Sequence, residues 1–221
     1  EYAPYREFQV KAGHGRYTNN SEAGFRYCKD QGPWPPSPEN YNVFLFGGST
    51  AYNLGVPEND TIASHLQECL GEVHGKHVCL YNFGCPLFFS SPESVLFERL
   101  LVQGYRPDAA VFIDGLNEYF HEEDNPGFTS QIKVLFENSQ SLSFHLKAAF
   151  DNLPMVVYLR QHYRMGPEPA QDIPYDEAAI KALAEKARQR YWENQKMIMA
   201  AASAAGVKSF FIWQPIPLYK Y

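Results

Sequence analysis

Three polar or small residues follow three separate apolar runs, and their chemistry is complementary. Ser49 comes after "VFLFGG", Gly84 after "HVCLYNF" and Asn117 after "DAAVFIDGL". A serine hydroxyl can attack an acyl carbon, while a glycine N–H and an asparagine amide can donate hydrogen bonds to the oxyanion that forms. The Ser49 N–H would add a donor from the start of the next helix. This set of residue types favours acyl transfer through a serine.

Each of these residues also has an ordinary structural interpretation. "GGST" (47–50) is typical of a turn that caps a helix, Gly84 of a tight turn before Pro86, and Asn117 of a cap at a strand end. Their order and their positions at the ends of three successive runs favour the chemical interpretation. Asp114, in the same "DGLNE" stretch, is expected to be a structural acceptor of backbone N–H groups.

The apolar runs predict buried parallel strands. Short unbroken apolar runs are typical of strands that are covered on both faces. We expect strands over residues 43–47, 77–84, 108–115 and 207–215. Because ligands bind at the carboxyl ends of the strands in such a sheet, Ser49, Gly84 and Asn117 are expected to converge on one crevice.

Helical patterns alternate with these runs. The stretch 59–72 begins with a capping residue and places Ile62, Leu66 and Leu70 on one stripe. Residues 91–104 predict a helix with Ser91 as N-cap, and 174–206 predicts a long Ala-rich helix closed by glycine. Strands alternating with helices indicate an α/β fold.

Two segments lie outside the regular alternation of strands and helices. Residues 1–42 end in "GPWPPSPEN" and predict an irregular lead-in packed on a domain formed by residues 43–221. Residues 116–153 contain a loop around "EEDNPG" and then helical periodicity. The run "HEED" (121–124) is interpreted as solvated loop carboxylates rather than a metal site.

The composition excludes several classes. The chain has 221 residues, 45% of them hydrophobic and 20% charged, with a net charge of −6, which argues against nucleic-acid binding. No apolar run reaches the ~20 residues that span a bilayer.

The four cysteines permit either disulfides, with Cys69–Cys79 as one reachable pair, or free thiols. They do not fix the compartment, although an extracytoplasmic location is favoured over a cytoplasmic one.

Nucleotide motifs are missing around Ser49. "FGGSTAYN" has neither the lysine of a phosphate loop nor a G-x-G-x-x-G pattern, and the cysteines form no C-x-x-C pair. We therefore expect no metal and no organic cofactor.

Taken together, the stretches that contain Ser49, Gly84 and Asn117 resemble the SGNH hydrolase superfamily, the GDSL-like esterases. "VFLFGGSTAYNLGVPENDTIASHLQ" is similar to the serine block in a GGS form, "VCLYNFGCP" to the glycine block and "PDAAVFIDGLNE" to the asparagine block. The resemblance implies a three-layer α/β/α domain with a flavodoxin-like parallel sheet. It implies hydrolysis of a small acyl ester, such as an O-acetyl group on a carbohydrate or a lipid ester, by Ser49, Gly84 and Asn117. The alternatives are a non-catalytic carbohydrate- or polymer-binding module and an O-acyltransferase that uses the same serine. The oligomeric state is open.

The chain departs from this family in two places. Glu118 stands where aspartate is usual, and no Asp-x-x-His block follows the fourth predicted strand. A serine needs a base to attack an ester at neutral pH. We expect the catalytic His and Asp to lie beyond Tyr221, so that this chain is C-terminally incomplete and inactive alone. Recruitment of His121 and a non-catalytic relative are the alternatives.

Overall fold

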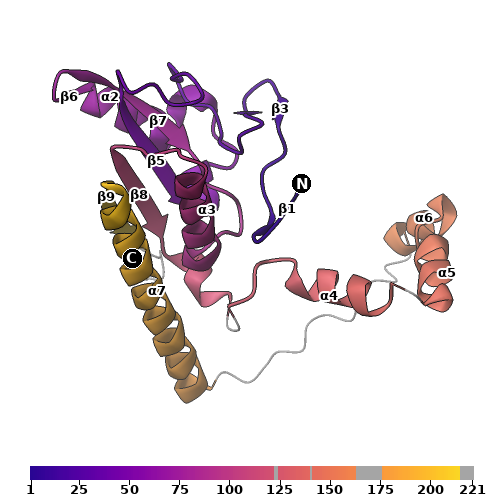
Figure 1. Cartoon of the computed structure of the whole chain (residues 1–221). Helices are drawn as coiled ribbons and strands as arrows, with labels where there is room; N and C mark the ends of the chain where they lie inside the picture. The colour runs from indigo at the N-terminus through magenta and orange to yellow at the C-terminus, as the bar shows by residue number, and fades with distance from the viewer. Residues whose placement is uncertain (122–123, 140, 163–175, 215–221) are drawn as a thin grey trace, which may run out of the picture. The chain divides into compact units, whose positions relative to one another are not determined.

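The fold is seen in a computed structural model that describes residues 1–121, 124–139, 141–162 and 176–214 (Figure 1). The chain divides into two compact units, one formed by Glu1–Gly127 with Ala182–Tyr221 and the other by Phe128–Lys181. The segment 1–42 lies in the first unit. The predicted boundary at residue 42 stays a prediction.

The first unit is built around a five-stranded sheet. The strands are β6 (Glu72–Val73), β7 (Lys76–Asn82), β5 (Tyr41–Gly47), β8 (Ala109–Asp114) and β9 (Lys208–Trp213), in that spatial order. Four of them are parallel, and only the two-residue β6 pairs antiparallel with its neighbour. The parallel strands run in the order second, first, third, fourth, which is the flavodoxin-like order. The predicted α/β class is confirmed.

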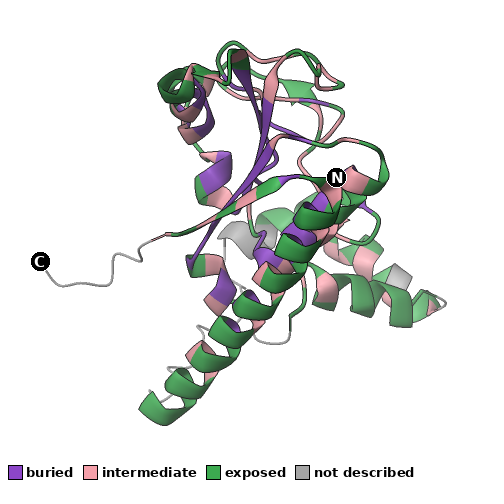
Figure 2. Cartoon of the chain, turned by 60° about the vertical axis from the view of Figure 1, so that its left-hand side comes forward, coloured by how far each residue is buried: buried purple, intermediate pink, exposed green. Residues whose placement is uncertain are grey.

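Helices cover both faces of this sheet, as predicted. Alternate residues of β5 point to opposite faces, so Val43 and Leu45 pack with α1 (Ser49–Tyr52) and α2 (Ile62–Leu70), whereas Phe44 and Phe46 pack with α3 (Ser90–Val102) and α7 (Glu177–Ala205). Figure 2 shows the central strands as mostly buried.

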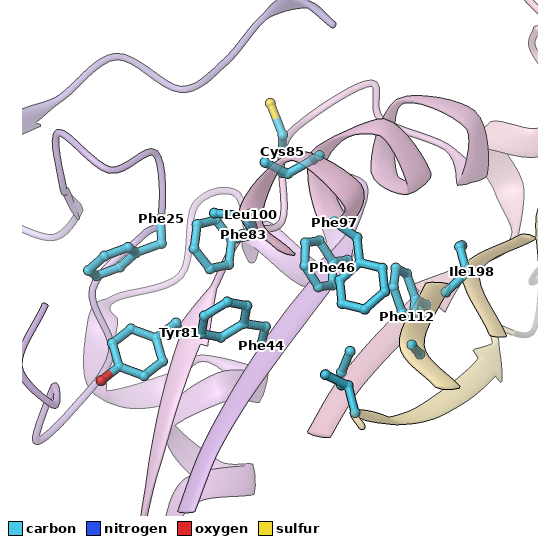
Figure 3. Packing of buried hydrophobic residues seen from close by; sticks show 14 of the residues in the cluster. Phe25, Phe44, Phe46, Tyr81, Phe83, Cys85, Phe97, Leu100, Phe112 and Ile198 are labelled. Atoms are coloured by element: carbon cyan, nitrogen blue, oxygen red, sulfur yellow. The ribbon is translucent and has the colours of Figure 1, made fainter. Parts of the chain in front are cut away.

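Aromatic rings fill the core beneath α3. Phe46 stacks on Phe112 with ring centroids 4.8 Å apart, and Phe97 meets Phe112 edge-on at 5.6 Å (Figure 3). Such pairs add to the stability that area burial alone supplies. The high aromatic content therefore serves the core at these positions.

The lead-in segment is irregular but attached to the sheet. It contains two short hairpins, β1 (Tyr2–Ala3) with β2 (Glu7–Phe8) and β3 (Gly13–His14) with β4 (Asn19–Asn20). The Arg26 N–H donates to the Asn82 carbonyl oxygen at 2.8 Å, and Phe25 is fully buried in the aromatic core. These contacts hold the segment against the end of β7.

Three details differ from the sequence-based expectations. Helix α3 begins at Ser90, so Ser91 lies inside the helix and is not its N-cap. On α2, Ile62 and Leu66 of the predicted stripe pack against the core, but Leu70 is 40% exposed. The most buried residues of this helix are Ala63, Ser64 and Gln67.

The third difference concerns β9, which was expected to be a buried strand. It forms the edge of the sheet, and its residues are mostly exposed or half-buried. An apolar run alone does not tell an edge strand from a central one.

The second unit is helical. It contains α4 (Thr129–Glu137), α5 (Leu142–Asp151) and α6 (Pro154–His162), followed by the start of α7. The first residues of the predicted long helix lie outside the described residues, as do Glu122 and Glu123 of the "HEED" run. Within the described residues, no helix combines the length and apolarity that crossing a membrane requires.

Candidate active site

The strand order creates a switch point between β5 and β8. Ligands of open α/β sheets bind beyond the carboxyl ends of the strands at such a point, because the connections leave the sheet in opposite directions there. Ser49 follows β5 and Asn117 follows β8, in the 3₁₀ turn η2 (Leu116–Tyr119). The topology thus brings Ser49 of the serine block close to Asn117 of the asparagine block.

Ser49 is the first residue of α1, and its side chain is partly exposed. Two glycines allow this sharp strand-to-helix turn. Gly47 has φ +149°, and a Cβ there would lie 2.5 Å from the Cβ of Ala51 and 2.6 Å from the Ile113 carbonyl oxygen. Only glycine fits so close to β8. The apolar strand therefore delivers a hydroxyl to an accessible turn.

Asn117 lies directly over the second glycine. Its Nδ2 donates to the Phe88 carbonyl oxygen at 2.7 Å, and a Cβ on Gly48 would lie only 2.3 Å from the same nitrogen. An amide nitrogen carries two hydrogens, so one N–H remains after the bond to Phe88. The arrangement places an amide donor beside the backbone that carries Ser49.

A small cavity of about 30 Å³ opens at this point. Ser49, Asn117, Asp114, Phe88 and Gln214 contribute to its lining. A site of this size holds about one or two oxygen-sized groups. It can accommodate a carbonyl oxygen or a water, whereas a large acyl group would have to lie outside it.

Gly84 does not line this cavity. Its N–H donates to Asn82 Oδ1 at 3.0 Å, and a Cβ at Gly84 would lie 2.6 Å from the Tyr52 nitrogen. The geometry therefore gives Gly84 a packing role, in which the absent side chain lets α1 approach the end of β7. Its role as an oxyanion donor stays a prediction.

Two buried residues that the sequence analysis did not single out fix α1. Asn82 Nδ2 donates to the Ala51 carbonyl oxygen at 2.8 Å. Arg26 is completely buried and donates to the carbonyl oxygens of Tyr52, at 2.6 Å, and Asn53, at 2.7 Å. The last carbonyls of a helix have no partners within it, so these donors hold the short helix in place.

Three carboxyl groups are buried at or near the cavity, and Asp114 is one of its lining residues. Glu93, Asp114 and Glu118 are all buried. Burial, and then the nearby Glu118 carboxyl, raise the pKa of Asp114 to about 8. Burial, and then the Asp114 and Glu118 carboxyls, also raise the pKa of Glu93, whose two carboxyl oxygens are buried and have no hydrogen-bond partner among the described residues. The predicted role of Asp114 as a structural acceptor of backbone N–H groups stays a prediction.

Glu118 links the asparagine turn to two helices. It accepts the Ser90 N–H at the start of α3 at 2.6 Å, and Arg190 on α7 forms an ion pair with it at 3.3 Å. Burial raises the pKa of Glu118, and these two partners act in the opposite direction. Glu118 therefore supplies the cap of α3 that was assigned to Ser91, and it anchors the residue next to Asn117.

Histidine is not part of the cavity lining in the described part of the chain. His121 stacks on Phe89 with ring centroids 4.2 Å apart, and its Nδ1 lies 2.9 Å from the Asn125 carbonyl oxygen. Burial lowers the pKa of His121, which keeps the ring neutral at pH 7. The side chains of His145 and His162 lie outside the described residues.

The cysteines are not candidates for the nucleophile. All four are free; Cys28, Cys79 and Cys85 are buried, and only Cys69 is exposed. Burial raises the pKa of Cys28 and of Cys85 to about 12, so neither is a thiolate at neutral pH.

Comparison with solved structures finds several to which the chain is similar. The chain is similar to AlinE4, an SGNH-hydrolase family esterase, with 20% identity over 38% of this chain and 45% of that one, at a TM-score of 0.33. It is similar to TesA with 14% identity over 80% of this chain and 62% of that one, at a TM-score of 0.38. In both cases the chain spans less than two thirds of the neighbour's length.

A third neighbour is a catalytic mutant of Axe2, an acetylxylan esterase from Geobacillus stearothermophilus. The identity is 12% over 76% of this chain and 74% of that one, at a TM-score of 0.32. No family model matches the chain, and no curated protein matches it.

Proposed function

We propose that the protein is a serine ester hydrolase of the SGNH type. The observation that carries the proposal is the juxtaposition of Ser49 and Asn117 around one oxygen-sized cavity at the switch point of the sheet. A nucleophile and an oxyanion donor must lie within a few ångströms of one acyl carbon, and these two residues are 68 positions apart in the sequence.

In the proposed reaction, Ser49 Oγ attacks the ester carbonyl carbon. The C–O bond to Ser49 forms, the carbonyl oxygen becomes an oxyanion in the cavity, and the backbone N–H of Ser49 and the remaining N–H of Asn117 stabilise it. During the attack Ser49 Oγ gives its proton to the general base, and collapse of the intermediate breaks the bond between the acyl carbon and the alcohol oxygen, so the alcohol leaves with that proton. Water then attacks the acyl-serine and releases the acid.

The proposed substrate is the ester of a small acyl group. The cavity of about 30 Å³ matches the carbonyl oxygen of such an ester. The small acyl group is the one that the resemblance of the three sequence blocks implies. The proposal assigns the nucleophile and one side-chain donor, and it leaves the general base to experiment.

The test is hydrolysis of p-nitrophenyl acetate by protein expressed from its complete coding sequence. We expect turnover in the wild type and a loss of at least 1000-fold in Ser49→Ala, a size typical for removal of a nucleophile. Ser203→Ala, at an exposed serine on α7, is the matched control and should keep the wild-type rate. Equal activity of wild type and Ser49→Ala would refute the proposal.

A further inference from the structure

A large cavity of the first unit lies away from Ser49. It has a volume of about 870 Å³. Its lining comes from the lead-in segment, which includes Tyr27 and Trp34, and from one side of α3 with the turn that follows. It shares no lining residue with the cavity beside Ser49. Its volume falls in the range of small-molecule binding sites.

Aromatic side chains form a rigid wall of this cavity. Trp34 and Tyr105 have ring centroids 4.5 Å apart, and His14 stacks on Tyr27 at 6.2 Å. Trp34 and Tyr27 are both held from behind by the buried ring of Phe25. A wall fixed in this way loses little side-chain entropy when a ligand binds.

Positive charge is concentrated in the same cavity. Its lining contains two arginines, Arg6 and Arg99, and one carboxylate, Glu22. Burial lowers the pKa of Arg6, and the charge of Arg99 acts in the same direction. Arg6 Nε is buried and has no hydrogen-bond partner, although another of its nitrogens donates to Gln9 at 3.0 Å. The local excess of cations stands against a net charge of −6 for the whole chain.

A second cavity adjoins the first. It has a volume of about 280 Å³, shares Gln103 and Tyr105 with the first, and adds three prolines and a third cation, Arg106. We call the two adjoining cavities the arginine groove, defined by the lining residues of both. Two adjoining cavities suit a ligand that has more than one unit.

We propose that the arginine groove binds an acidic saccharide, a chain of sugar units that carry carboxylates. Aromatic faces bury the apolar C–H faces of sugar rings. The amides of Gln9, Asn20 and Gln103 can pair with hydroxyl groups, and guanidinium groups pair with carboxylates in a bidentate geometry. The proposal does not rest on the esterase function, because binding is measured without turnover.

The test is isothermal titration of the full chain with galacturonate oligomers. The matched ligand is the same oligomer with its carboxyl groups reduced to alcohols, which keeps the rings and removes the charge. We expect binding of the acidic oligomer and a roughly tenfold or greater loss of affinity for the reduced one, a loss of the size that a charged hydrogen-bonded pair supplies.

Two variants locate the binding. Arg99→Gln and Arg106→Gln change exposed side chains in the groove and should each weaken binding about fivefold to tenfold, since each removes one carboxylate partner. Arg188→Gln changes an exposed arginine of α7 outside the groove and should leave the affinity unchanged. Thermal unfolding of each variant checks the fold.

Several outcomes would overturn the proposal. They are no binding at millimolar oligomer, equal binding of the reduced oligomer, or an equal loss in Arg99→Gln and Arg188→Gln. Tighter binding of single-stranded RNA or of polyglutamate than of the saccharide would assign the groove to another class of polyanion.

Discussion

The side-chain nitrogen of Asn117 lies 2.7 Å from the Phe88 carbonyl oxygen, to which it donates a hydrogen bond. This bond fixes the rotation of the amide, so its second N–H has a set direction before any substrate arrives. Preorganised donors of this kind stabilise a developing oxyanion without reorganisation during the reaction. In the proposed mechanism, the Phe88 carbonyl therefore positions the oxyanion donor.

Asn117→Ala should reduce kcat about 100- to 1000-fold, as expected for the loss of one oxyanion donor. KM should change little, because the lost hydrogen bond strengthens only as charge develops on the carbonyl oxygen. Steady-state kinetics with an aryl acetate measures both parameters, and Asn59→Ala, at an exposed asparagine, serves as the control. A higher KM with unchanged kcat would show that Asn117 binds substrate and is not an oxyanion donor.

Gly48→Ala should displace the side-chain amide of Asn117, the same oxyanion donor. The new Cβ would lie 2.3 Å from Asn117 Nδ2 and 3.0 Å from the Phe88 carbonyl oxygen, so the amide must move. We expect a loss in kcat similar to that of Asn117→Ala. The losses should not add in the double variant, because both changes remove one interaction.

The control for this substitution is Gly13→Ala, since a Cβ at Gly13 would meet nothing within 4 Å. If the losses in kcat of Gly48→Ala and Asn117→Ala add in the double variant, Gly48 acts through a contact other than the one with Asn117.

The buried carboxyl pair Glu93 and Asp114 should make stability fall as pH rises. The pKa of Asp114 is about 8 in the folded protein against 3.8 for the free side chain, and the pKa of Glu93 is also raised. Between about pH 4 and pH 8 the folded state therefore binds more protons than the unfolded state. The free energy of unfolding falls by about 1.4 kcal/mol per pH unit for each such proton.

Glu93→Gln removes one of these protons and should make this pH dependence shallower, which urea unfolding at pH 5, 7 and 8.5 can measure. The control is Glu98→Gln, an exposed position on the same helix. Two results would contradict the assignment, namely a wild-type stability that rises with pH over this range or an unchanged slope in Glu93→Gln.

The sequence predicted the parts of the site that local patterns encode. Apolar runs of strand length mark β5, β7 and β8, and the parallel arrangement then places Ser49 and Asn117 at one edge of the sheet. The turn at Gly47 and Gly48 could also be recognised, since only glycine fits so close an approach.

The remaining features depend on contacts between distant segments. Glu118 caps α3 from 28 residues away and pairs with Arg190 across 72 residues, so no local signal favours it over Ser91 as the cap. Arg26 lies in an irregular segment, where the sequence alone suggests an exposed arginine. It is buried because its guanidinium donates to the carbonyl oxygens at the end of α1, which have no partner within the helix. The exposure of β9 depends on its place at the edge of the sheet, which its own residues do not encode.

The most direct test of the account is the mass of the protein after brief exposure to p-nitrophenyl acetate and an acid quench. Protein expressed from its complete coding sequence should gain the mass of one acetyl group, and peptide mapping should place that group on Ser49. Ser49→Ala should gain none under the same conditions, while Ser203→Ala should behave as the wild type. Acetylation at a different residue, or an equal mass gain in Ser49→Ala, would contradict the assignment of Ser49 as the nucleophile.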